Sequence, residues 1–173
     1  MPCSCFFARR LRHISGRSAR KHSGSSGRLL AALFMVVRRA QKNILDTQTG
    51  SIQKDLASDG TASAELRPEP DFLQRLYELV CKYRLTDIDR EMTSQELADD
   101  KSKAVSMIPL EHYEISVTLN GRSLLICGDQ TAVYHMTSDE DAANFINAVT
   151  SVKKAVTELP EWTALPPANG GYD

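Results

Sequence analysis

The feature that most restricts the fold is an Asn-Gly pair at residues 120–121, with apolar residues alternating on both sides of it. Both central positions of a two-residue type I′ turn need a positive φ, which Asn and Gly tolerate best. Apolar and polar residues alternate over residues 113–119, as in a strand with one buried face. The turn then fixes the pairs Leu119 with Arg122, Val117 with Leu124 and Ile115 with Ile126. Beyond the first pair, apolar residues face apolar residues, so turn and pattern predict the same β-hairpin.

Three helices are predicted around this hairpin. Apolar residues from Phe72 to Tyr83 recur with a helical period, which predicts a helix from Asp71. A capping-box pattern predicts a short helix over residues 94–104. Ser138, followed by three acidic residues, predicts the start of a long helix that Pro160 ends.

The order of these elements defines the expected fold. Gly128-Asp129 predicts a turn into a third strand, residues 131–136. We therefore expect an α+β protein: a two-layer domain with an N-terminal helix, a three-stranded antiparallel β-meander and a long C-terminal helix packed on the sheet. Three strands leave two open edges, so either an unrecognised strand around residues 105–108 or a protein partner is expected to cover one of them.

The N-terminal part of the chain has a charge unlike the rest. Residues 1–45 hold ten of the 21 Lys and Arg and no Asp or Glu, so the net charge of −1 is +10 followed by −11. An Arg-rich, Ser-rich, acid-free N-terminus is typical of a mitochondrial presequence, which the inside-negative potential attracts at roughly 2.3 kcal/mol per charge per 100 mV. Phe7, Leu11 and Ile14 supply an apolar helical face. A plastid transit peptide and a retained basic arm remain as alternatives.

The expected domain organisation has four parts. Residues 1–45 are the expected mitochondrial targeting presequence, with cleavage near Arg28 or Arg38-Arg39. Residues 46–70 lack a hydrophobic period and collect Asp, Ser, Thr, Gly and Pro, which predicts a flexible linker. Residues 71–160 are the α+β domain, and residues 161–173 are expected to be a disordered tail. The apolar run 29–37 is nine residues long, short of the roughly 20 that a membrane span needs, so no transmembrane span is expected.

The cysteines and histidines do not form a recognisable catalytic or metal-binding pattern. No Cys or His spacing suits zinc. The four histidines and four cysteines are His13, His22, His112, His135, Cys3, Cys5, Cys81 and Cys127. Half of them lie in the expected presequence. His112 and His135 lie on predicted strands, and we expect them, like Cys81 and Cys127, to have structural roles.

Other ligand-binding patterns also fail on their spacing. The acidic stretch 87–91 suggests a calcium loop, but the positions that need Gly and a bidentate Glu hold Met92 and Ala98. No phosphate-binding glycine motif and no nucleophile elbow occur, so catalytic, cofactor-binding and metal sites are each expected to be none. A domain with a net charge near −11 repels phosphate, so nucleic acid is not an expected partner of the acidic domain.

These observations favour a non-catalytic protein. The leading hypothesis is an accessory subunit or assembly factor of a mitochondrial multiprotein complex (respiratory chain, ATP synthase or mitoribosome periphery), in the matrix or on the matrix side of the inner membrane. It would use no cofactor and would bind protein partners within the larger complex. The alternative is a free-standing protein- or peptide-binding adaptor that retains its basic N-terminal arm.

Overall fold

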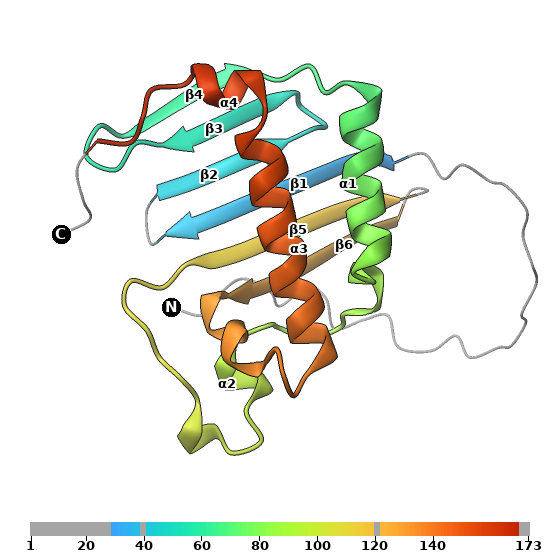
Figure 1. The fold of residues 1–173 in the computed structure, drawn as a ribbon, viewed down its shortest axis with the longest axis vertical. Coiled ribbons are helices and arrows are strands. Elements are labelled where there is room, and N and C mark those ends of the chain that lie inside the picture. Colours follow the sequence, from blue (N-terminus) through green and yellow to red (C-terminus); the bar gives the residue numbers. More distant parts are fainter. Residues whose placement is uncertain (1–28, 39–40, 120–121, 170–173) are drawn as a thin grey trace, which may run out of the picture.

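The sheet has six strands rather than three. The computed structural model describes residues 29–38, 41–119 and 122–169. Neighbouring strands are antiparallel in the order β4-β3-β2-β1-β5-β6, as Figure 1 shows. The strands are β1 (Leu29–Arg38), β2 (Gln41–Asp46), β3 (Ser51–Asp55), β4 (Thr61–Glu65), β5 (His112–Leu119) and β6 (Arg122–Asp129).

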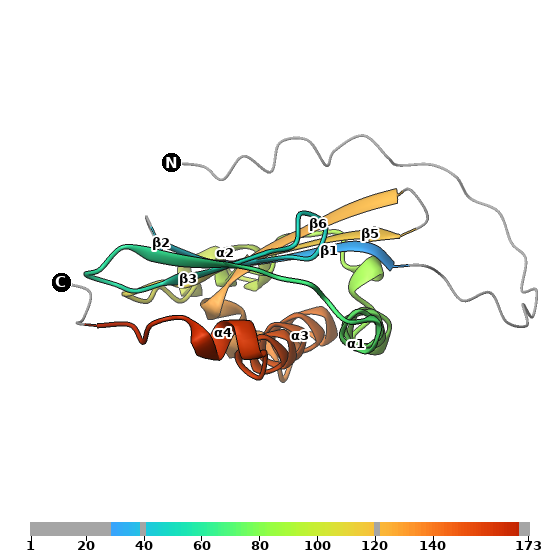
Figure 2. The same ribbon diagram turned by 90° about the horizontal axis from the view of Figure 1, so that it is seen from above.

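Helices cover one face of this sheet. The four α-helices are α1 (Pro70–Lys82), α2 (Ser94–Leu97), α3 (Glu140–Thr157) and α4 (Pro160–Ala164). In Figure 2, α1, α3 and α4 lie on the same side of the sheet, which gives two layers. The α+β class, the two-layer arrangement and the long C-terminal helix on the sheet are therefore confirmed.

The predicted strand pairing of the hairpin is confirmed, while the predicted turn at residues 120–121 lies outside the described residues. β5 and β6 pair with Leu119 opposite Arg122, Val117 opposite Leu124 and Ile115 opposite Ile126. Ile115, Val117 and Ile126 are buried beneath the helices, while Ser116 and Leu125 point to the other face. The alternation of side chains and the length of the turn therefore set the register together.

The predicted third strand is wrong. Residues 130–135 form a 3-10 helix, η4 (Gln130–His135). The Asp129 carboxylate accepts hydrogen bonds from the Thr131 backbone N–H, at 2.8 Å, and from the Thr131 hydroxyl. These bonds turn the chain immediately after β6, because a side-chain acceptor offers the backbone an alternative to the sheet ladder.

The boundaries expected for the presequence and the linker are also corrected. Residues 46–70, expected to be a linker, contain β3 and β4, while residues 29–38 of the expected presequence form β1 and its residues 41–45 form all but the last residue of β2. The Asp46 carboxylate accepts from the N–H groups of Gln48 and Thr49, and Gly50 has φ +68°, so a tight turn joins β2 to β3. Residues 1–28 lie outside the described residues.

Three smaller expectations change as well. The helix expected over residues 94–104 is reduced to α2 and the 3-10 turn Lys101–Lys103. Residues 105–108 form no strand, and the sheet neighbour that covers β5 is β1. Within the expected tail, residues 160–164 form α4. Trp162 packs against the core, with the Lys54 ammonium 5.3 Å from its ring centre. Residues 170–173 lie outside the described residues.

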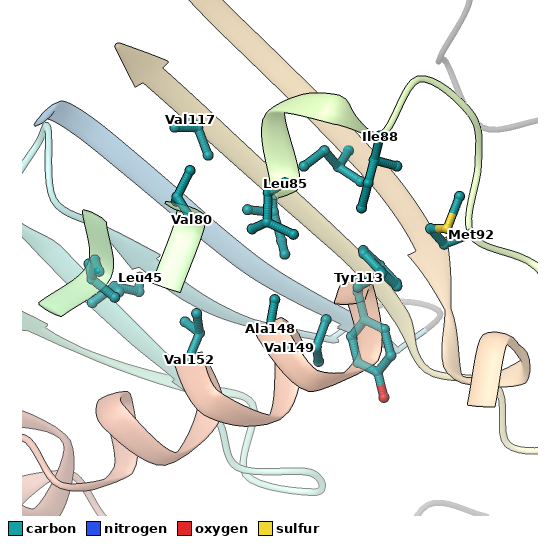
Figure 3. Close-up of a cluster of buried hydrophobic side chains, with 14 of the residues drawn as sticks. Leu45, Val80, Leu85, Ile88, Met92, Tyr113, Val117, Ala148, Val149 and Val152 are labelled. Carbon is teal, nitrogen blue, oxygen red and sulfur yellow. The ribbon is translucent and has the colours of Figure 1, made fainter. Parts of the chain in front are cut away.

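The core lies between the sheet and the helices. Phe145 and Ala148 on α3 and Met92 after α1 are fully buried. Figure 3 shows part of this cluster, with labelled side chains from β2, α1, α3 and β5 and from the segment that follows α1: Leu45, Val80, Leu85, Ile88, Met92, Tyr113, Val117, Ala148, Val149 and Val152. Ile88 and Met92 anchor a stretch that is otherwise polar, and this holds residues 88–92 against β6.

Candidate functional site

The edge strand β6 is half covered by a single residue of its own chain. The β5–β6 register has no bulge, so the backbone groups of Ser123, Leu125, Cys127 and Asp129 point away from β5. Met92 donates its N–H to the Cys127 carbonyl and accepts from the Asp129 N–H, both at 2.9 Å. Met92 thereby acts as a one-residue parallel strand next to Gly128. Met92 therefore covers the part of the edge that runs from Cys127 to Asp129.

Gly128 makes this close approach possible. A Cβ at Gly128 would lie 2.6 Å from the Met92 carbonyl oxygen and 2.6 Å from Cε1 of Phe145. Both distances are shorter than van der Waals contact. Gly128 was predicted to be a turn residue, whereas in the structure it is the last but one residue of β6 and leaves space for two neighbours.

The other half of the β6 edge is open among the described residues. No described backbone group pairs with Ser123 or Leu125 on their outer side. Leu125 is 51% exposed and lies on the face opposite the helices, and the Ser123 hydroxyl is 2.9 Å from that of Thr118. An uncovered row of N–H and C=O groups beside an exposed leucine is a template for strand pairing. In Figure 1 this segment is the right-hand part of β6.

The opposite edge of the sheet is protected differently. β4 is five residues long, and Thr61, Ser63 and Glu65 are all exposed. Glu65 also forms an ion pair with Arg67 at 3.0 Å. Short, polar and charged edges discourage pairing with another chain. Of the two described edges, β6 is therefore the better candidate for a binding site.

The structure does not bring the two described histidines together into a site. His112 is exposed at the start of β5, and no described hydrogen bond joins it to His135. His135 on η4 instead has its Nε2 2.9 Å from the hydroxyl of Ser94. Ser94 is fully buried, and its Oγ also accepts from the Val105 N–H at 2.8 Å.

The geometry of this Ser–His pair differs from that of a nucleophile and its base. A nucleophilic serine needs access to a substrate, and Ser94 has none. A base also needs a third group to orient it, but the Asp129 carboxylate binds Thr131 instead of His135. The Ser94 N–H in turn donates to the Thr131 hydroxyl at 2.8 Å. The network therefore ties α2 and η4 to the loop that begins at residue 104.

The described cysteines and the acidic stretch 87–91 do not form a ligand site either. Cys81 is exposed on α1, and Cys127 is partly buried on β6. Within the described ranges no three His, Cys, Asp or Glu side chains are close enough to hold a metal ion. Arg90, in the middle of the acidic stretch, binds the carboxylates of Asp139 and Asp141 at 2.6 and 3.2 Å. The stretch is therefore held to the N-terminus of α3 by ion pairs.

One pocket lies between β2, α3 and α4. It has a volume of about 160 Å³ and is lined mainly by apolar groups from Asn43, Ile44, Leu45, Lys153, Val156, Thr157 and Trp162. The Lys153 ammonium at its wall is 2.8 Å from the Glu111 carboxylate and 4.8 Å from the Tyr113 ring centre. Glu111 neutralises that charge, so the pocket suits a small uncharged apolar group. Sequence reasoning missed it because part of its lining fell in the expected presequence.

Comparisons with known proteins assign no family to this chain. No helix in the described part of the chain is long and apolar enough to cross a membrane. Comparison with protein-family models, with curated proteins and with solved structures gives no significant match.

Proposed function

We propose that the protein is a non-catalytic accessory subunit or assembly factor of a mitochondrial multiprotein complex, and that it binds its partner through the β6 edge. The observation that carries this proposal is the open half of β6 at Ser123 and Leu125. An extended partner segment would pair with these backbone groups and cover the Leu125 side chain, which is 51% exposed. Such strand addition gains affinity from main-chain hydrogen bonds and specificity from alternate side chains.

The mitochondrial part of the proposal is supported by residues 1–28. They contain seven Lys and Arg and no acidic residue. Since β1 begins at Leu29 and pairs with both β2 and β5, we place the processing site near Arg28 instead of Arg38-Arg39. Residues 29–173 hold 14 basic and 22 acidic residues, a net charge of −8. A processed protein of this charge suits protein partners in the matrix better than nucleic acid.

The test uses a proline at the open edge. The N–H of Ser123 points away from β5, so Ser123→Pro removes an outward donor and leaves the β5–β6 ladder in place. On a native gel of mitochondria, the unaltered protein should migrate with a high-mass assembly, while the Ser123→Pro protein should migrate as a monomer with a nearly unchanged melting temperature. Ser123→Ala is the matched control, because it loses the Thr118 contact but keeps the N–H.

Two results would contradict the proposal. One is a free monomer in matrix fractions for the unaltered protein, and the other is full assembly of the Ser123→Pro protein. Mass spectrometry of the endogenous N-terminus separates the leading proposal from the adaptor. Retention of residues 1–28 would favour the adaptor.

A further inference from the structure

Most of the exposed large apolar side chains of the described residues lie in two short segments. Of the five large hydrophobic residues that are exposed in the described chain, four lie in two short segments: Val105, Ile108, Val133 and Tyr134. Ile108 is 87% exposed and Tyr134 is 53% exposed. Scattered single residues of this kind are normal on a surface, but a gathered set marks an interaction site. We call these four residues the apolar end patch.

Hydrogen bonds through Ser94 hold the two segments of the patch together. The Ser94 hydroxyl accepts from the Val105 N–H at 2.8 Å and contacts the His135 ring at 2.9 Å. Val133 and Tyr134 immediately precede His135 on η4. Because Ser94 is fully buried, both segments are fixed to the core although their apolar side chains are exposed.

The segments that precede and follow the apolar end patch in the sequence carry a net negative charge. Residues 84–103 and 139–141 contain nine acidic and four basic residues, a net charge of −5. Ion pairs of 3.4 Å from Arg84 to Glu140 and 2.6 Å from Arg90 to Asp139 join these two segments. Figure 1 shows α2 and the start of α3 together at this end of the molecule. The Glu96 and Asp99 carboxylates form no hydrogen bond or ion pair with any described residue.

We infer that the apolar end patch binds a basic amphipathic helix of a protein partner. This inference rests on the proposed protein-binding function but concerns a surface other than the β6 edge. Apolar side chains of such a helix would cover Ile108 and Tyr134, and its Lys or Arg residues would face Glu96 and Asp99. A helix laid on an apolar surface recognises it through residues at i, i+3, i+4 and i+7. The surrounding carboxylates repel an acidic helix and a phosphate surface.

The test uses the full 173-residue chain and a fluorescent model peptide. The peptide is a helix of about 18 residues made of Leu and Lys, with Leu at i, i+3, i+4 and i+7. Fluorescence anisotropy should show binding that Tyr134→Ser and Ile108→Ser each weaken by about tenfold. Leu125→Ser is the matched control, because Leu125 is 51% exposed but lies on β6, and it should bind the peptide like the unaltered protein.

The charges are tested in the same assay. Glu96→Gln with Asp99→Asn should weaken binding several-fold at low salt, and the loss should shrink as salt screens the charges. Asp59→Asn with Glu114→Gln removes two carboxylates elsewhere and should change nothing. A Leu and Glu peptide of the same pattern should not bind.

Several outcomes would overturn the inference. These are equal weakening by Leu125→Ser, equal binding of the Leu and Glu peptide, or binding only after residues 1–28 are removed, which would make the chain's own basic segment the occupant. Failure here would be distinguishable from failure of the proposed function, because the Ser123→Pro assembly test does not involve the apolar end patch.

Discussion

At the scale of single residues, Gly128 controls how three parts of the molecule meet. Gly128 belongs to β6, and the Met92 backbone and the Phe145 ring both pack against it. Protein interiors are packed as densely as organic crystals, so there is no free volume for a methyl group at Gly128. The absence of a side chain at Gly128 thus lets Met92 cover half of the edge and confines the open part to Ser123 and Leu125.

The first prediction concerns this glycine. Gly128→Ala would place a Cβ 2.6 Å from both the Met92 oxygen and the Phe145 ring, so we expect a loss of about 1–3 kcal/mol in the free energy of unfolding. Urea unfolding measures the loss. Gly60→Ala is the comparison, because nothing lies within 4 Å of its new Cβ and only its φ of +80° opposes the change. Its cost should be about 1 kcal/mol. Unaltered stability of Gly128→Ala would show that Met92 does not pack as described.

At the scale of the element, α3 is stabilised at its first turn by Asp139. The carboxylate accepts from the Ala142 N–H at 3.0 Å and pairs with Arg90 at 2.6 Å. Burial alone would raise the pKa of Asp139, but these hydrogen bonds and the Arg90 charge outweigh burial and hold that pKa below its ordinary value. A group with a lowered pKa stabilises the fold above its unfolded pKa, and the stabilisation disappears as the pH falls through the folded value.

The second prediction tests the lowered pKa of Asp139. Asp139→Asn keeps a good N-cap residue but loses the ion pair with Arg90, so it should cost about 0.5–1 kcal/mol at neutral pH. The difference from the unaltered protein should persist down to about pH 4 and then shrink as the pH falls through the folded-state pKa, which lies below the ordinary value for Asp. Thermal unfolding between pH 7 and about pH 2 measures it. Asp89→Asn is the control and should show no such difference, while a constant gap at all pH values would contradict the electrostatic explanation.

The elements differ in how well their local sequence predicts them. The β5–β6 hairpin, α1 and α3 were predicted because hydrophobic period, turn residues and helix ends agree within each segment. The N-cap of α3 is Asp139, however, and not Ser138 as predicted. Residues 131–136 alternate like a strand, yet Asp129 turns them into η4 through two side-chain hydrogen bonds. In β3 only Ile52 and Asp55 are buried and in β4 no residue is buried, so residues 51–65 resemble a loop in composition.

The candidate site was predictable only in outline. An open sheet edge was expected, but its identity depends on β1, which covers β5, and on Met92, which covers part of β6. A single bridging residue leaves no periodic signal in a sequence. The basic composition of residues 1–45 also concealed β1, because targeting segments and a strand with Arg at its end can share that composition.

At the scale of the whole molecule, β1 decides where the chain can be shortened. It lies between β2 and β5, so its removal takes one of the two neighbours from each of these strands and separates the sheet into two pieces. The third prediction is that a protein lacking residues 1–28 unfolds cooperatively on heating, and that one lacking residues 1–38 has no cooperative transition. Circular dichroism on heating distinguishes them. A cooperative transition in the shorter protein would show that β1 is dispensable.

The pairing of β1 also has a consequence for synthesis and transport. Leu29 pairs with Leu119, 90 residues further along the chain, whereas β1 to β4 follow one another directly. Contacts between such distant residues form slowly, because the intervening loop must close first. A growing chain that has passed β4 therefore still lacks the hairpin that completes its sheet. If the chain is threaded through a narrow translocation channel N-terminus first, the β5–β6 hairpin enters last, and the sheet can close only after nearly the whole chain has crossed.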